Sequence, residues 1–411
     1  MCHVVRASRQ AMTASVRGAV DIEGATVPDP SLRCVAHRLE AGTSTKFRVE
    51  TFGTSITAGG YKKEVRFQPY LRRLLIAAFP RSPNIVVDTH GYSGASAEYL
   101  HACVDRLLPS RAHLYVVELC DNFLSGPKAA IPAGKTVGDL VNTLRARPGP
   151  ASGPTSVLLL APFAQSCAKK LARRYPYAHL PRDPQTTNAL IDGCLRSFHP
   201  GDAHNSTTTL PAVLEAVADD MHLGIVSVRR AFARTIRAFG QSAGGGAQGA
   251  AEASIDGLSK LLRTYIQQDM VHPNAEGYQL MAELVVQLLK RAAREATPSE
   301  CARARDVPLP SQLPQHRSWA HQPIALASAP PRVCAFGEEM HAHIRSALGW
   351  TYQVELSPSG RQKPGFIATR PGARLETCFR PGRISATASK RQVRGPQAGW
   401  AVSCGSRSFS Y

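Results

Sequence analysis

Five short segments with strand-like patterns, the first alternating and the others mainly apolar, constrain the fold of this chain most strongly. They lie at residues 46–52, 84–88, 113–119, 156–161 and 223–228. Patterns typical of helices stand between or after them, at 69–79, 95–108, 229–239 and 275–294. Short apolar strands that alternate with helices are typical of a parallel sheet buried on both faces. The sequence therefore predicts an α/β fold, a three-layer α/β/α domain.

At 411 residues the chain is longer than one compact domain usually is, so we expect a main domain with appendages. The composition divides it into five parts: an N-terminal extension, a catalytic domain, a Pro-, Gln- and Ser-rich linker, a small β-rich accessory module and a basic disordered tail. Their bounds are 1–45, 46–296, 297–330, 331–379 and 380–411. The accessory module shows a helix-like patch at 337–348 and strand-like pieces at 350–356 and 365–369.

The formal net charge of +19 raises the alternative of nucleic-acid binding. Much of the excess lies in the tails, because residues 380–411 hold six Lys or Arg and no Asp or Glu. No helix-turn-helix, zinc-finger or aromatic RNA-binding pattern accompanies it, so we expect no specific nucleic-acid partner. We also expect no transmembrane segment, because no run of eighteen apolar residues occurs.

The ten cysteines contain no CxxC pair, so the sequence predicts neither a zinc ribbon nor a thioredoxin-like site. Disulfides are expected if the chain is exported, and Asn205-Ser206-Thr207 is a glycosylation sequon. The N-terminus lacks the apolar core of a signal peptide, and its Arg- and Ser-containing start resembles a transit peptide or a sequence that begins downstream of the true start. The localisation and the oligomeric state stay open.

A candidate nucleophile, Ser55, follows the first predicted strand within Gly53-Thr54-Ser55-Ile56-Thr57. Parallel sheets place their ligand sites beyond the carboxyl ends of the strands, which is where this serine stands. A serine hydroxyl becomes a good nucleophile only when a base takes its proton. Taken alone, Ser55 is explained as well by capping of the helix that follows.

A candidate base lies far along the chain, in Asp269-Met270-Val271-His272-Pro273-Asn274. The Asp269 carboxylate, three residues before His272, can hold the imidazole Nδ1 proton and leave Nε2 toward a nucleophile. Pro273 is expected to fix the start of the helix at 275–294. The alternative is a helix-capping aspartate and a surface histidine.

Two further turns offer hydrogen-bond donors for the negative oxygen that forms when a serine attacks a carbonyl group. Gly94 follows the second predicted strand, where its N–H group can approach a substrate closely. Asn122 follows the third strand and brings a side-chain amide. The alternatives are an ordinary turn glycine and a loop-capping amide.

Taken in order, these blocks resemble the SGNH hydrolase superfamily, the GDSL-like lipases and esterases, over about residues 46–294. Gly53 to Thr57 matches the first block, Gly-Asp-Ser-Ile/Leu-Thr/Ser, with Thr54 in place of the aspartate. Ser93-Gly94 matches the second block, and Asp269 to His272 matches the last. Cys120-Asp121-Asn122-Phe123 keeps only the asparagine of the Gly-x-Asn-Asp block.

The resemblance implies a flavodoxin-like sheet and a serine esterase that works through an acyl-enzyme intermediate without a metal or organic cofactor. It implies Ser55 as nucleophile, His272 as base and Asp269 as the residue that orients it. The implied oxyanion donors are the N–H groups of Ser55 and Gly94 and the Asn122 side chain. The substrate class stays open between an acetylated glycan and a lipid-type ester. The alternative on the same fold is a binding protein whose altered Asn122 block impairs catalysis.

Overall fold

The structure, a computed structural model, describes most of the predicted sheet region and parts of the C-terminal region. The described residues are 27–42, 45–59, 66–93, 95–108, 111–119, 127–147, 149–150, 155–162, 210–228, 230–232, 235, 264–267, 272–303, 344–346, 348, 350–356, 362–368, 374–378, 400–403 and 406–410. The chain divides into two compact units, residues 1–97 with 108–323 and residues 98–107 with 324–411.

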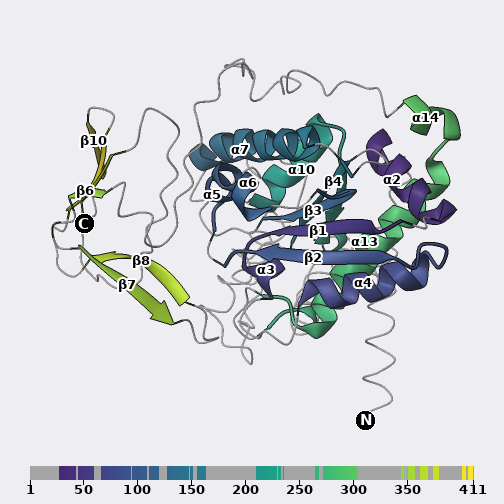
Figure 1. The fold of residues 1–411 in the computed structure, drawn as a ribbon, viewed down its shortest axis with the longest axis horizontal. Coiled ribbons are helices and arrows are strands. Elements are labelled where there is room, and N and C mark those ends of the chain that lie inside the picture. The colour runs from purple at the N-terminus through teal and green to yellow at the C-terminus, as the bar shows by residue number, and fades with distance from the viewer. Residues whose placement is uncertain are drawn as a thin grey trace, which may run out of the picture. The chain divides into compact units, whose positions relative to one another are not determined.

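The first unit is built on a five-stranded parallel sheet (Figure 1). Its strands are β1 (Phe47–Gly53), β2 (Ile85–Gly91), β3 (Leu114–Glu118), β4 (Ser156–Ala161) and β5 (Gly224–Ser227). They pair in the order β2-β1-β3-β4-β5, which is the flavodoxin-like order that the resemblance implied. The order changes direction between β1 and β3, so the carboxyl ends of these two strands flank the point where such sheets bind ligands.

Helices cover both faces of this sheet. Figure 1 shows α7 (Pro127–Ala146) and α10 (Leu210–Asp220) on one side, and α4 (Phe67–Ala78) and α13 (Ala275–Glu295) on the other. Helix α2 (Pro30–Ala41) packs against α13 and β4. The three-layer α/β/α prediction is therefore confirmed. The apolar runs predicted the central strands well because both faces of the sheet are covered there, and every residue of β3 and β4 is buried.

Two predicted helices match described ones, since the pattern at 69–79 corresponds to α4 and the pattern at 275–294 to α13. The helix predicted over 95–108 is instead two short helices, α5 (Ala97–Ala102) and α6 (Val104–Leu107), which lie mainly in the second unit. Of the segment 229–239 the structure describes 230–232 and 235, all helical. Among the described helices, none has the length and apolarity that crossing a membrane requires.

Helix α2 lies within the segment that the composition assigned to an N-terminal extension. It begins with Pro30 in the first turn and Asp29 as the N-cap, two residue types that are common at helix starts. The Asp29 carboxylate accepts a hydrogen bond from Ser31 N at 2.9 Å and lies 3.2 Å from the Arg145 guanidinium. Burial raises the pKa of Asp29, and the Arg145 charge opposes that rise. The folded unit thus starts before residue 46.

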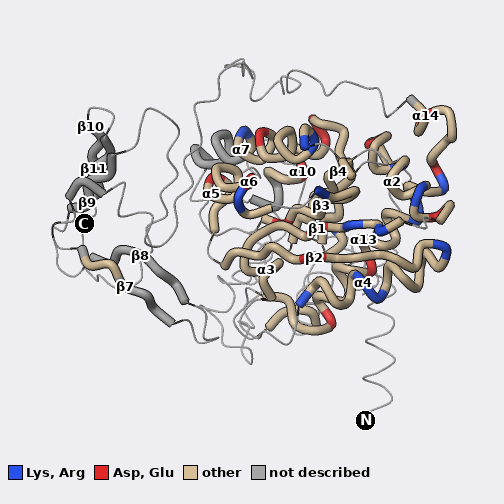
Figure 2. The backbone as a smooth tube through the Cα atoms, in the orientation of Figure 1, with Lys and Arg blue, Asp and Glu red and all other residues tan. Residues whose placement is uncertain are grey.

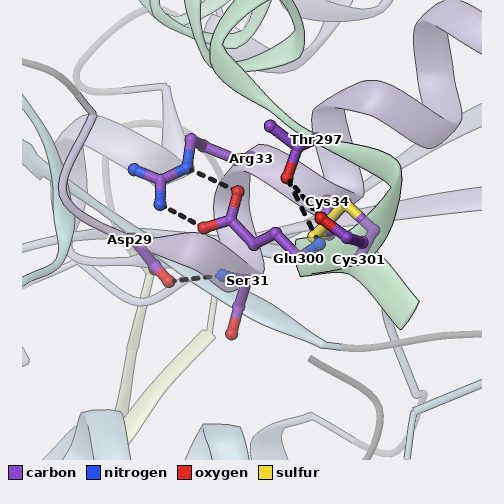
Figure 3. The surroundings of a disulfide bond; sticks show 8 residues. Asp29, Ser31, Arg33, Cys34, Thr297, Glu300 and Cys301 are labelled. Atoms are coloured by element: carbon purple, nitrogen blue, oxygen red, sulfur yellow. Dashed lines mark hydrogen bonds and ion pairs between the residues drawn. A yellow bond between two sulfur atoms is a disulfide. The ribbon is translucent and has the colours of Figure 1, made fainter. Parts of the chain in front are cut away.

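A group that we call the terminal clasp joins α2 to the short helix α14 (Pro298–Arg303) (Figure 3). It consists of the disulfide Cys34–Cys301 and the adjacent ion pair of Arg33 with Glu300, whose Nε and Oε2 are 3.1 Å apart. A further bond, from Val27 N to a Glu295 carboxylate oxygen at 2.6 Å, ties the start of the described chain to the end of α13. The fold therefore also extends past residue 296, into the segment that composition assigned to a linker.

Basic and acidic positions both occur along the helices of the first unit (Figure 2), and the strands β1 and β2 contain the acidic residues Glu50 and Asp88. The β1 residue Glu50 is fully buried. Its carboxylate lies 2.8 Å from His90 Nε2 and 3.6 Å from the Arg48 guanidinium. Burying a carboxylate costs little free energy only when such partners replace the interactions with water that it loses.

The second unit contains antiparallel strands. They are β6 (Ile344–Ser346), β7 (Trp350–Leu356), β8 (Gln362–Ala368), β9 (Arg374–Cys378), β10 (Trp400–Ser403) and β11 (Ser406–Ser410). One sheet has the order β10-β11-β9-β6, and β7 pairs with β8. Residues 344–346 pair with β9 as a strand, where the pattern at 337–348 predicted a helix. Strands β10 and β11 lie in the segment that was predicted to be a disordered tail. They form because β10 pairs with β11, and β11 pairs with β9.

Acid is expected to destabilise the first unit through His113, at the start of β3. The side chain is 2% exposed, its Nδ1 accepts a bond from Arg48 N at 3.0 Å, and its ring stacks on Phe47. Burial, together with the charges of Arg38 and Arg48, lowers the pKa of His113 to about 4. Because the unfolded chain binds this proton first, the stabilising contribution is present above pH 6.5 and is lost as the pH falls toward 4, by about 3 kcal/mol.

This loss can be measured by urea unfolding at pH 7 and pH 4, followed by circular dichroism. The matched variant His113→Asn keeps a hydrogen-bond acceptor but does not titrate, so its free energy of unfolding should depend less steeply on pH. An equal pH dependence in both proteins would contradict the assignment to His113.

Candidate functional site

Ser55 lies at the carboxyl end of β1, as the sequence predicts. It is the first residue of the short helix α3 (Ser55–Ala58), which follows the strand directly and has Thr54 as its N-cap. The side chain is 8% exposed. Ser55 therefore stands beside the point where the strand order of the sheet changes direction.

Two glycines let α3 approach the sheet this closely. A Cβ atom on Gly53 would lie 2.2 Å from the Glu118 carbonyl oxygen and 2.4 Å from Thr57 Oγ1. A Cβ atom on Gly91, at the end of β2, would lie 2.2 Å from Ala58 N. Real Cβ atoms do not come so near other atoms, so glycine at these two positions allows the helix of Ser55 to rest on the strand ends.

A buried carboxyl group, that of Glu118, holds the turn around Ser55. Glu118 ends β3 directly beside Gly53 in the sheet. Its Oε2 accepts hydrogen bonds from Thr54 N at 3.1 Å, Thr57 N at 3.0 Å and Thr57 Oγ1 at 2.8 Å. Thr54 Oγ1 donates to Oε1 at 3.0 Å. The side chain of the N-cap Thr54 makes no capping bond of its own, so Glu118 fills that role from a neighbouring strand.

Burial raises the pKa of Glu118, and the bonds from Thr57 and Thr54 oppose that rise. When the group binds a proton, Oε1 is the oxygen that can carry it, because two backbone N–H groups already donate to Oε2. The Oε1 proton would then be donated to Thr54 Oγ1. The hydrogen bonds between Glu118 and the turn can therefore form whether the Glu118 carboxyl group is ionised or protonated.

His272 is held by its backbone in a short segment before α13. Gln267 N donates to the His272 carbonyl oxygen at 2.8 Å, and Asn274 N donates to the Tyr265 carbonyl oxygen at 3.0 Å. Asn274 is the N-cap of α13, and its Oδ1 accepts a bond from Gly277 N at 2.9 Å. Pro273 lies directly before this cap, at the entry to the helix that begins at Ala275.

One hydrogen bond links the helix that follows His272 to the helix of Ser55. Tyr278 Oη, in the first turns of α13, donates to the Ile56 carbonyl oxygen at 3.0 Å, although the two residues are 222 positions apart. The Tyr278 side chain is fully buried. The bond therefore links the helix of Ser55 to the first turns of α13, the helix that follows His272 along the chain.

The other predicted site residues, Gly94, Asn122 and Asp269, lie outside the described residues. Sequence reasoning missed Glu118 and Tyr278. An acidic residue that ends an otherwise apolar strand was the available signal for Glu118. Tyr278 fits the apolar face of a helix, so its hydroxyl gave no signal.

In the described part of the chain, no group of three or more His, Cys, Asp or Glu side chains is arranged to hold a metal ion.

Comparisons with known proteins give structural similarities only. No protein-family model matches the chain, and no curated protein matches it. Among solved structures it is similar to a two-domain esterase active on acetylated mannans, at 14% identity and a TM-score of 0.46, over 84% of this chain and 71% of that one. It is also similar to the lipase/acylhydrolase from Enterococcus faecalis, at 17% identity and a TM-score of 0.37, over 59% and 95% of the two chains.

An acetyl xylan esterase from Geobacillus stearothermophilus is similar at 13% identity and a TM-score of 0.35, over 60% of this chain and 95% of that one. The fold itself rests on the geometry of this chain. Its parallel sheet, its strand order and the helices on both faces agree with the fold that the resemblance to the SGNH hydrolases implied.

Proposed function

We propose that this protein is a serine esterase that hydrolyses a carboxylic ester through an acyl-enzyme intermediate. The observation that carries the proposal is the bond from Tyr278 Oη to the Ile56 carbonyl oxygen, because it anchors the helix of Ser55 to the helix that His272 precedes. A nucleophile at the end of β1 and a base in the last motif block are the two groups that such a reaction needs.

In the proposed first step, His272 takes the proton of Ser55 Oγ as this oxygen bonds to the carbonyl carbon of the ester. The N–H groups of Ser55 and Gly94 and the Asn122 amide donate to the resulting oxyanion. When the intermediate collapses, the carbon–oxygen bond to the alcohol breaks and the protonated His272 gives its proton to the leaving oxygen. Water then attacks the acyl-enzyme with His272 as base, which releases the acid and restores Ser55. Asp269 orients His272 and stabilises its charged form.

The substrate class that we propose is a carboxylic ester of a glycan or a lipid-type alcohol. The chemistry of the proposed site acts on the ester carbonyl and is common to both. A panel of acetylated oligosaccharides, short-chain esters and long-chain esters, compared by kcat/KM, separates the two classes.

A fluorophosphonate probe is expected to label the folded protein at Ser55. The probe reacts with a serine only when a neighbouring base activates it, so the urea-denatured protein should not be labelled. Mass spectrometry of proteolytic peptides would locate the adduct. If the folded protein remains unlabelled and inactive across the ester panel, the esterase proposal fails, and the alternative of a binding protein on this fold is favoured.

A further inference from the structure

We infer that Glu118 is a positioning residue for Ser55, which fixes the turn that presents the nucleophile and its N–H group to the substrate. The inference rests on the proposed function, and it adds a residue that none of the four motif blocks contains.

The first argument is geometric. Glu118 binds the backbone N–H groups of Thr54 and Thr57, which stand on either side of Ser55 and Ile56. It also binds both threonine hydroxyls. One carboxyl group thus fixes both ends of a four-residue turn, and the orientation of the Ser55 peptide within the turn is set by these ends. The Ser55 N–H group is one of the proposed oxyanion donors, so its direction affects the transition state directly.

The second argument concerns what else holds α3. This helix has only four residues, too few to be stable without tertiary contacts, and its N-cap side chain makes no capping bond. The helix also packs on Gly53 and Gly91, contacts α4, buries Ile56 in the core and accepts the bond from Tyr278. Among these contacts, those of Glu118 are hydrogen bonds to the backbone on both sides of Ser55.

The third argument concerns the cost of burying this carboxyl group. The other residues of β3, Leu114 to Val117, are apolar and buried, and Glu118 itself is 2% exposed. A carboxyl group in such a place loses its hydration, and its raised pKa shows that the four hydrogen bonds do not fully offset the loss. Ionisable groups whose pKa is shifted by burial occur often at functional sites, and this one lies beside the proposed nucleophile.

The test compares Glu118→Ala with Glu118→Gln. The glutamine amide oxygen can accept the bonds from Thr54 N and Thr57 N, and its NH₂ group can donate to Thr54 Oγ1, so this variant retains the turn without the charge. The alanine variant retains none of these bonds. Steady-state kinetics on an activated acetyl ester should be normalised to the number of sites that a fluorophosphonate labels after prolonged incubation.

For Glu118→Ala we expect kcat per labelled site to fall about a hundredfold with KM changed little, because a small displacement of a reacting group has a cost of this order. For Glu118→Gln we expect kcat within a few fold of the parent. A merely structural role would reduce the number of labelled sites and leave kcat per site unchanged, and that result would overturn the inference. Equal losses of kcat in both variants would also overturn it, since the charge and not the bonds would then matter.

If Glu118→Ala does not fold, Thr57→Val replaces it in the test, because it removes one hydroxyl donor and keeps the side-chain volume. We expect kcat per labelled site to fall about tenfold in this variant, because one of the four hydrogen bonds that position the turn is lost. An unchanged kcat would overturn the inference. A parent protein that is neither labelled nor active would instead refute the proposed function, so the two failures are distinguishable.

Discussion

Replacement of Ser55 by alanine is expected to lower kcat for ester hydrolysis by on the order of a millionfold, the size of effect typical of a serine hydrolase whose nucleophile and base act as a unit. His272→Ala should be about as damaging for the same reason. Neither change should prevent folding, because the Ser55 side chain adds little buried surface and His272 is held by its backbone. Initial rates on the best ester of the panel, with circular dichroism as a check on folding, would measure both effects.

A matched control is available in Ser82→Ala. Ser82 precedes β2, at the end of the sheet opposite to Ser55, and its buried hydroxyl donates to the Leu39 carbonyl oxygen at 2.9 Å. Its replacement should reduce the free energy of unfolding by about 1 kcal/mol and leave kcat unchanged. Wild-type rates in Ser55→Ala would remove Ser55 from the proposed role. Asp269→Asn then separates a triad from a Ser-His dyad, because only a triad would lose activity severely.

The second large effect is expected from the terminal clasp. Replacing Cys34 and Cys301 together by serine should lower the free energy of unfolding of the first unit by about 4 kcal/mol, because the disulfide joins residues 267 positions apart and restricts the unfolded chain strongly. Urea unfolding followed by far-ultraviolet circular dichroism would measure the loss. The protein should be purified without reductant, so that the parent retains its disulfide.

Arg33→Met serves as the control for this double variant, because it removes the ion pair with Glu300 and leaves the disulfide in place. We expect it to cost about 1 kcal/mol, as partly exposed ion pairs contribute little. Equal unfolding curves for the double cysteine variant and the parent would show that the clasp does not stabilise the unit.

The sequence predicted the strands of the sheet well, but it did not predict helix α2 or the terminal clasp. The difference has a physical reason. Strands buried on both faces are mostly apolar, and that preference shows in local composition alone. Helix α2 and the clasp depend instead on contacts with α13 and α14, more than 200 residues away. Ten cysteines allow many pairings, so the partner of Cys34 could not be predicted from spacing.

The same contrast applies to the candidate site. Ser55 and His272 were predicted from short motifs. Each motif contains a reactive side chain and also the residues of a turn, after a strand for Ser55 and before a helix for His272. Glu118 gains its role only from the parallel register that puts it beside Gly53. The bond between Tyr278 and Ile56 depends on how α13 packs, which local periodicity does not specify.

The wide separation of Cys34 and Cys301 also has a consequence for how the chain is made. At ordinary rates of translation, Cys34 leaves the ribosome roughly 15–50 s before Cys301. Four other cysteines, at positions 103, 120, 167 and 194, are synthesised in that interval. Each is an incorrect partner for Cys34 that becomes available before the correct one. The clasp can therefore close only after Cys301 has been synthesised, and any earlier pairing of Cys34 must then be exchanged, as a disulfide isomerase does.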